Sequence, residues 1–80
     1  MAEVLIFGAA SVAAKASRVM VRIAEPATAG RVIAAMAEQH PELRFATSGA
    51  RLAVNQSFAA EETPVAAGDE LALISLVGGG

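Results

Sequence analysis

One stretch of helical periodicity stands among short, strand-like apolar runs, and this combination restricts the fold of the 80-residue chain most strongly. Thr28 is a good helix N-cap residue. Beyond it, Val32, Ile33 and Met36 recur at the spacing that places side chains on one helix face. Pro41 then ends the helix. A single amphipathic helix needs an apolar surface to pack against, and strands must supply it.

Two strand-like runs precede this helix. The run "VLIF" at residues 4–7 is β-branched and aromatic, and Gly8 ends it. The run "RVMVRIAE" alternates, with Val19, Val21 and Ile23 on one side, as expected for a half-buried strand. We expect the two runs to pair as a hairpin, with the alanine- and serine-rich segment "GAASVAAKAS" as its long loop.

The second half of the chain predicts further strands. The stretch "PELRFATSG" indicates irregular chain that offers Leu43 or Phe45 to the core. The run "ARLAVNQSF" predicts a strand with Leu52 inside, a turn at Asn55–Gln56 and a second strand at Phe58. A loop, "AAEETPVAAGDE", leads to the last strand, "ELALISLV". The order indicates an α+β fold, in which one main helix covers one face of a mixed sheet.

The last strand is apolar on both sides. Leu71 and Leu73 share one side, and the other side carries Ala72, Ile74 and Leu76. The sheet face opposite a single helix should be polar if it meets only water. Two interpretations stay open here: harmless exposure on central strands, or a face that binds a partner.

Composition excludes several classes of function. The chain has no cysteine, which removes thiol nucleophiles and cysteine metal sites and agrees with a reducing cytoplasm. A net charge of -2 and the absence of Trp and Tyr argue against nucleic-acid binding. The run "VLIFGAASVAA" is shorter than the ~18 to 20 residues of a membrane span. We therefore expect a cytoplasmic protein that binds neither nucleic acid nor membrane.

The side chains offer no catalytic constellation, which leaves the main-chain carboxylate of Gly80 as the candidate reactive group. His40 is expected to face solvent at a helix end, and Lys15 to be a surface charge in a loop. Gly78 and Gly79 carry no side chain, so an extended tail could pass through a narrow channel of another enzyme. Such a carboxylate can be activated as a mixed anhydride with AMP. Glycine ends also occur as idle, disordered termini, and that alternative stays open.

Several of these motifs together resemble the MoaD branch of the MoaD/ThiS sulfur carriers, over essentially all 80 residues. They are "VLIF", the helix after Thr28, "LAVNQSF", "TPVAAGDELALIS" and the terminal "VGGG". The resemblance implies a ubiquitin-like β-grasp fold: a mixed sheet with one main helix packed on one face. We expect the β-grasp domain at residues 1–75 and an extended, flexible C-terminal Gly-Gly tail at residues 76–80.

The resemblance also implies a sulfur-transfer cycle. An ATP-dependent adenylyltransferase related to ubiquitin-activating enzymes would adenylate Gly80, and sulfur would convert the adenylate to a thiocarboxylate. The tail would insert into a MoaE-type large subunit of a heterotetrameric molybdopterin synthase and donate sulfur to cyclic pyranopterin monophosphate, in molybdenum cofactor biosynthesis. The chain would not be an enzyme on its own. It would hold no metal and no tightly bound cofactor, and ATP would be used by the activating enzyme.

The family's interface positions carry over to this chain where its motifs match. Phe7, Phe58 and Ile74 match positions where the family has a bulky apolar residue against MoaE or the activating enzyme. Leu76 and Val77 of the tail complete the predicted partner-binding set. For Phe7 and Phe58, an ordinary place in the core is the alternative.

Two departures from the family pattern bear on the acceptor. Ser11 stands where many MoaD proteins have Arg, and Ser75-Leu76 stands where they have Pro-Pro. The alternatives are a ThiS-like carrier that delivers sulfur to thiazole, cysteine or another metabolite, and a ubiquitin-like protein modifier or binding module.

Overall fold

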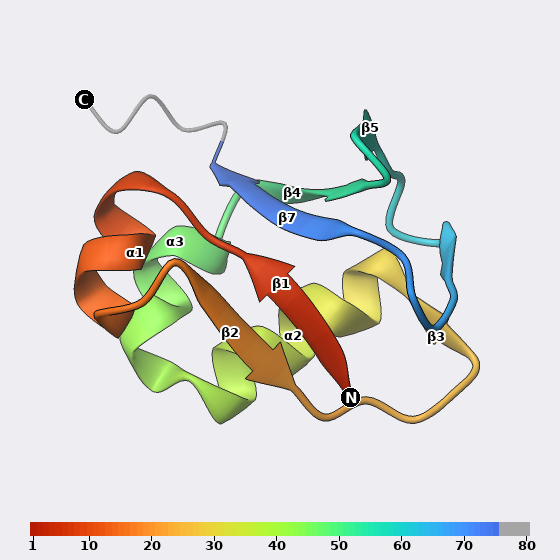
Figure 1. Ribbon diagram of the computed structural model, residues 1–80, viewed down its shortest axis with the longest axis horizontal. Coiled ribbons are helices and arrows are strands. Elements are labelled where there is room, and N and C mark those ends of the chain that lie inside the picture. The colour runs from red at the N-terminus through yellow and green to blue at the C-terminus, as the bar shows by residue number, and fades with distance from the viewer. Residues whose placement is uncertain (76–80) are drawn as a thin grey trace.

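A mixed sheet with one long helix across one face organises residues 1–75, the part of the chain that the computed structural model describes (Figure 1). In chain order the elements are β1 (Ala2–Leu5), α1 (Gly8–Ala14), β2 (Arg18–Val21), β3 (Ala27–Thr28), α2 (Ala29–Gln39), the 3₁₀ helix η1 (Pro41–Leu43), α3 (Arg44–Thr47), β4 (Ala50–Val54), β5 (Ser57–Phe58), β6 (Pro64–Val65) and β7 (Leu71–Ser75).

Within these residues, β2, β1, β7, β4 and β5 form the sheet in that order, and β3 pairs separately with β6. β1 runs parallel to β7, and the other neighbouring pairs of the main sheet are antiparallel. The predicted mixed sheet and the predicted antiparallel pairing of the first two strands are therefore confirmed. Of the described strands, β7 is the last in sequence, yet it lies at the centre of the main sheet, between β1 and β4 (Figure 1). It buries Leu71 and Leu73 on the side of α2.

The core lies between the sheet and α2, as the helical stripe predicted. Thr28 caps the helix, because its Oγ1 accepts a hydrogen bond from the Arg31 N–H at 3.3 Å. The helix turns Val32 and Met36 inward. The largest fully buried side chains of the described chain are Val4, Ile6, Val21, Val32, Met36, Leu43 and Leu52.

The segment "GAASVAAKAS" forms helix α1 and not the expected long loop. Its alanines have the highest intrinsic helix propensity, which explains the helix after the fact. Lys15 ends it in the left-handed conformation with φ of 57°, and its N–H donates to Val12 O at 3.2 Å. β1 correspondingly ends at Leu5, two residues before the predicted end, and Phe7 becomes the residue that precedes α1.

Residues 41–47 are also more regular than predicted. They form η1 and the short helix α3. Pro41 is the first residue of η1, a position that proline favours. Of the two residues offered to the core, Leu43 is fully buried and Phe45 is exposed. The loop "AAEETPVAAGDE" likewise contains the short strand β6.

A glycine near the start of α2 allows a close approach of the 59–63 loop. Gly30 N–H donates to Glu61 O at 2.9 Å, and Ala29 N–H donates to Thr63 O at 2.9 Å. A Cβ on Gly30 would lie 3.1 Å from the same Glu61 oxygen. The contact explains why a residue with poor helix propensity stands at this position.

The end of α2 covers the outer edge of β2. Gln39 accepts a hydrogen bond from the Arg22 N–H at 2.8 Å and donates one to Arg22 O at 2.7 Å. His40 Nε2 lies 2.9 Å from Met20 O, and because a carbonyl only accepts, this nitrogen carries the proton. His40 was expected simply to face solvent, but it is a structural residue of the β2 edge.

Candidate functional site

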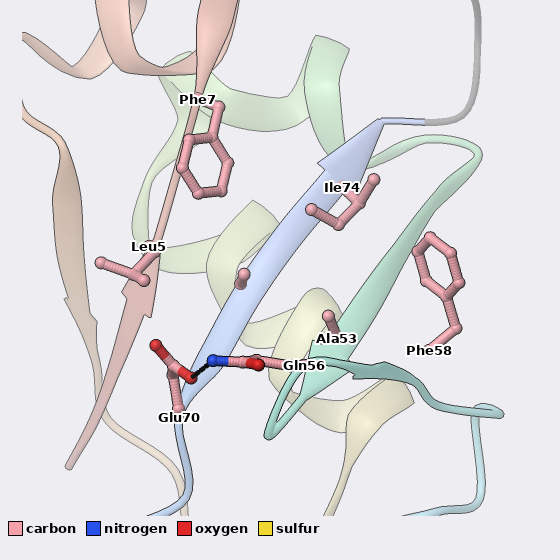
Figure 2. A pocket seen from close by; sticks show the side chains of 8 residues that line it. Leu5, Phe7, Ala53, Gln56, Phe58, Glu70 and Ile74 are labelled. Carbon is pink, nitrogen blue, oxygen red and sulfur yellow. Dashed lines mark hydrogen bonds between the residues drawn. The ribbon is translucent and has the colours of Figure 1, made fainter.

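The sheet face opposite α2 is hollowed and apolar. We call this surface the outer hollow, a pocket of about 330 Å³ lined by Leu5, Phe7, Ala53, Gln56, Phe58, Glu70, Ala72 and Ile74 (Figure 2). In the strand ladders, Ala72 stands next to Leu5 on one side and opposite Ala53 on the other. Two small side chains at the centre of the sheet, with larger side chains around them, produce the concave shape.

The outer hollow brings together three predicted partner-binding residues that are far apart in sequence. Phe7 and Phe58 have relative exposures of 57% and 59%, so neither belongs to the core. Figure 2 shows their rings on either side of Ile74, which is half-buried near the end of β7. An exposed apolar surface rimmed by polar residues is typical of a protein-binding site. The role of these three residues as partner contacts stays a prediction.

Polar groups close one end of the outer hollow. Gln56 Nε2 donates to Glu70 Oε1 at 3.4 Å (Figure 2). Asn55 fixes the backbone beside this pair: its N–H donates to Glu70 O at 2.7 Å, and its Oδ1 accepts from the Glu70 N–H at 2.9 Å. The sequence singled out "VNQ" and "GDE" as motifs but gave no signal that the two would be hydrogen-bonded to each other.

Asp69 extends this connection to the loop before β7. Its Oδ2 accepts from the Ala66 N–H at 2.7 Å, and its Oδ1 accepts from Asn55 Nδ2 at 3.1 Å. The Ala66 amide, followed by the Asn55 amide, lowers the pKa of the Asp69 carboxyl from its usual 3.8. Asp69 therefore stays ionised at neutral pH, and the two motifs form one structural unit at the start of β7.

A positive charge lies toward the other end of the outer hollow. Arg51 stands opposite Ile74 in the β4–β7 ladder. Its guanidinium carbon lies 5.9 Å from the centre of the Phe58 ring, within the range of a cation–π interaction. Sequence reasoning missed Arg51, although its alternation with Leu52 in β4 places it on the outer face.

The predicted tail residues Leu76, Val77, Gly78, Gly79 and Gly80 lie outside the described residues. They follow directly on β7, which begins at Leu71, next to Glu70, and carries Ile74 near its other end. Within residues 1–75, no three His, Cys, Asp or Glu side chains gather into a possible metal site. No helix in that range has the length and apolar character that a membrane crossing requires.

Solved structures similar to this chain share its fold. SAMP1 from Haloferax volcanii is 30% identical, with a TM-score of 0.78 over 98% of this chain and 97% of that one. A second structure, of H. volcanii small archaeal modifier protein 1, is 28% identical, with a TM-score of 0.75 over 89% and 91%. A "putative molybdopterin converting factor, subunit 1" from Pyrococcus furiosus is 15% identical, with a TM-score of 0.75 over 89% and 91%. The last similarity concerns the fold alone.

These similarities confirm the ubiquitin-like β-grasp fold expected from the sequence. No curated protein sequence matches the chain. The model of the ThiS family matches residues 4–80, which is nearly the whole chain. The protein therefore belongs to the ThiS family, the small sulfur carriers of ubiquitin-like fold.

Proposed function

We propose that this protein carries sulfur as a thiocarboxylate on Gly80 and serves as the small subunit of a molybdopterin synthase. The observation that supports the proposal most is the outer hollow. Exposed Phe7 and Phe58 flank Ile74 on β7, the strand whose chain continues into Gly78, Gly79 and Gly80. A partner that holds this face would contact β7, from which the chain continues toward Gly80.

The proposed chemistry takes place at the main chain and needs no side chain of this protein. A carboxylate oxygen of Gly80 attacks the α-phosphorus of ATP on the activating enzyme, and pyrophosphate leaves. Hydrosulfide then attacks the carbonyl carbon of the adenylate, the bond from that carbon to the AMP oxygen breaks, and AMP leaves with the electron pair. Loss of the proton on sulfur gives the thiocarboxylate. The carrier binds its partner and extends its C-terminal tail into the active site of that partner, which binds ATP.

The proposed partners are an adenylyltransferase related to ubiquitin-activating enzymes and a MoaE-type large subunit, the latter in a heterotetramer. Both would contact the same small protein at different stages of the cycle, so they would compete for the outer hollow. The proposed sulfur acceptor is cyclic pyranopterin monophosphate.

Reconstitution tests the proposed acceptor directly. The thiocarboxylated protein is mixed with a MoaE-type subunit and cyclic pyranopterin monophosphate, and molybdopterin is measured. We expect stoichiometric product from the native chain and none from Gly79→Val, because a side chain at this position would obstruct a channel that admits only glycine. Ser57→Ala, a substitution far from the tail in sequence, is the control and should retain the yield. Molybdopterin formation by Gly79→Val would refute the channel argument, and none from the native chain would refute the proposed acceptor.

A protein modifier is the second candidate function. Its support is the similarity to a small archaeal modifier protein, at higher identity than the similarity to the converting factor. The activation step would be the same, but a lysine amine would attack the adenylate or a thioester derived from it, and an isopeptide bond would form. Isopeptide-linked ladders that disappear when Gly79 and Gly80 are deleted would favour the modifier. Their absence, with molybdopterin formed in the reconstitution, would favour the carrier.

A further inference from the structure

The turn between β4 and β5 contains a residue that the turn itself disfavours. β4 and β5 are joined by the two residues Asn55 and Gln56, with φ of 52° and 71°. Positive φ at both central residues is the signature of a type I′ turn, whose second position strongly favours glycine. Asn tolerates this conformation, but Gln rarely adopts it. A residue that stands where the turn conformation disfavours it often serves another purpose, which points to a role for the Gln56 side chain.

The Gln56 side chain holds a carboxylate at the edge of an apolar surface. Gln56 and Glu70 both line the outer hollow, and the Gln56 amide donates to Glu70 Oε1 at 3.4 Å (Figure 2). The Glu70 backbone is held by Asn55 through two hydrogen bonds, of 2.7 and 2.9 Å. Glu70 is nevertheless exposed, and within the described residues it belongs to no ion pair. Its charge is thus fixed in place and open to a partner.

The opposite end of the outer hollow carries a charge of the opposite sign. Arg51 stands across from Ile74 and lies over the Phe58 ring at 5.9 Å. Like Glu70, it belongs to no ion pair within residues 1–75. Glu70 immediately precedes β7, and Ile74 lies four residues after it, which corresponds to about 13 Å at a strand rise of ~3.3 Å per residue. The apolar floor therefore runs between a carboxylate and a guanidinium.

We propose that the outer hollow docks a protein segment with apolar side chains between a Lys or Arg that pairs with Glu70 and an acidic residue that pairs with Arg51. Gln56 is the positioning residue for Glu70. The two unlike charges fix the direction in which the segment lies, because the reversed orientation would bring like charges together. This inference rests on the proposed function in one respect: the segment belongs to a partner of the carrier, here the activating enzyme.

The test compares variants for binding to the purified activating enzyme at low and high salt. Glu70→Gln should bind about tenfold more weakly at low salt, and the difference should shrink as salt screens the pair. Gln56→Gly should also bind more weakly, yet melt at a higher temperature, because glycine relieves the positive-φ turn. Glu62→Gln, which removes an exposed carboxylate outside the outer hollow, is the matched control and should bind like the native protein.

The proposal would be overturned if Glu70→Gln bound the activating enzyme as tightly as the native protein. It would also be overturned if Glu70→Gln and Glu62→Gln lost affinity for that enzyme to the same extent. A lower melting temperature for Gln56→Gly would show that Gln56 serves stability and would overturn its positioning role. Thiocarboxylate formation at saturating activating enzyme is scored separately. Native affinity of Glu70→Gln together with a normal thiocarboxylate yield would refute the docking proposal alone, whereas absence of thiocarboxylate from the native chain would refute the proposed function.

Discussion

Asp69 shows at the residue scale how two separated motifs come to depend on each other. Its two carboxylate oxygens accept hydrogen bonds from Ala66 and Asn55, which belong to the loop before β7 and to the turn after β4. Charge-assisted hydrogen bonds to a carboxylate favour its ionised form. Asp69 of the "GDE" motif therefore connects the turn after β4 to the loop before β7 through these two hydrogen bonds, which we call the clamp. Glu70 of the same motif lines the outer hollow.

The clamp predicts a specific dependence of stability on pH. The pKa of Asp69 is lowered in the folded protein. Its contribution to stability is therefore fully present above the unfolded-state pKa of 3.8 and is lost as pH falls through the folded-state pKa. Asp69→Asn should be less stable than the native protein at neutral pH, and the difference should shrink in acid.

Urea unfolding over a pH series measures this difference. Glu62→Gln serves as the control, because Glu62 makes no comparable pair of hydrogen bonds in the described chain. If the difference in free energy of unfolding between Asp69→Asn and the native protein stays constant from neutral pH to acid, the clamp does not depend on the charge of Asp69.

At the scale of elements, the end of α2 protects an exposed strand edge. Gln39 satisfies both the N–H and the C=O of Arg22, and His40 satisfies Met20 O. An unpaired strand edge is a template for pairing with another chain. The end of α2 thus occupies backbone groups at the end of β2 and in the residue that follows it.

Gln39→Leu should lower the free energy of unfolding by about 1 kcal/mol, because it removes one donor and one acceptor at the edge. Gln39→Glu is the matched variant, since it keeps an acceptor for the Arg22 N–H but removes the donor to Arg22 O. It should lose stability too, through the unpaired carbonyl. Denaturant unfolding measures both, and sedimentation tests for pairing of the opened edge. Native stability in Gln39→Leu would show that water replaces the side chain at no cost.

Elements with strong periodicity could be predicted, and those whose form depends on tertiary contacts could not. Met36 lies on a helical stripe and Val21 on an alternating strand, so their burial followed from spacing alone. Helix α1 was missed because its seven residues show no amphipathic stripe and a strand-like run leads directly into it. In the site, Phe7, Phe58 and Ile74 were predicted from the family resemblance and not from local periodicity. The hydrogen bond between Gln56 and Glu70 depends on β7 lying beside β4, which no local pattern reveals.

At the scale of the whole molecule, the two faces of the main sheet have different surroundings. One face packs on α2 and the other forms the outer hollow, so neighbouring residues of β7 lie on opposite faces. Leu73 is buried in the core and Ile74 lies on the outer face. We therefore expect that substitutions on the outer face change partner binding without loss of the fold.

Leu73→Ala and Ile74→Ala are a matched pair for this separation. Leu73→Ala should cost about 2 to 5 kcal/mol of stability, because it leaves a cavity in the core. Ile74→Ala should cost about 1 kcal/mol of stability or less. It should nevertheless weaken partner binding more than Leu73→Ala does, and Ile74→Glu should weaken partner binding further. Denaturant unfolding and binding to the activating enzyme measure the two effects. Collapse of the fold in Ile74→Glu would show that Ile74 belongs to the core.

Whether Gly80 carries sulfur is tested by the mass of the intact protein after co-expression with its activating enzyme. We predict a gain that corresponds to one exchange of oxygen for sulfur, located at Gly80 and absent when Gly79 and Gly80 are deleted. An unchanged mass for the native chain, with full function retained by the shortened one, would contradict it.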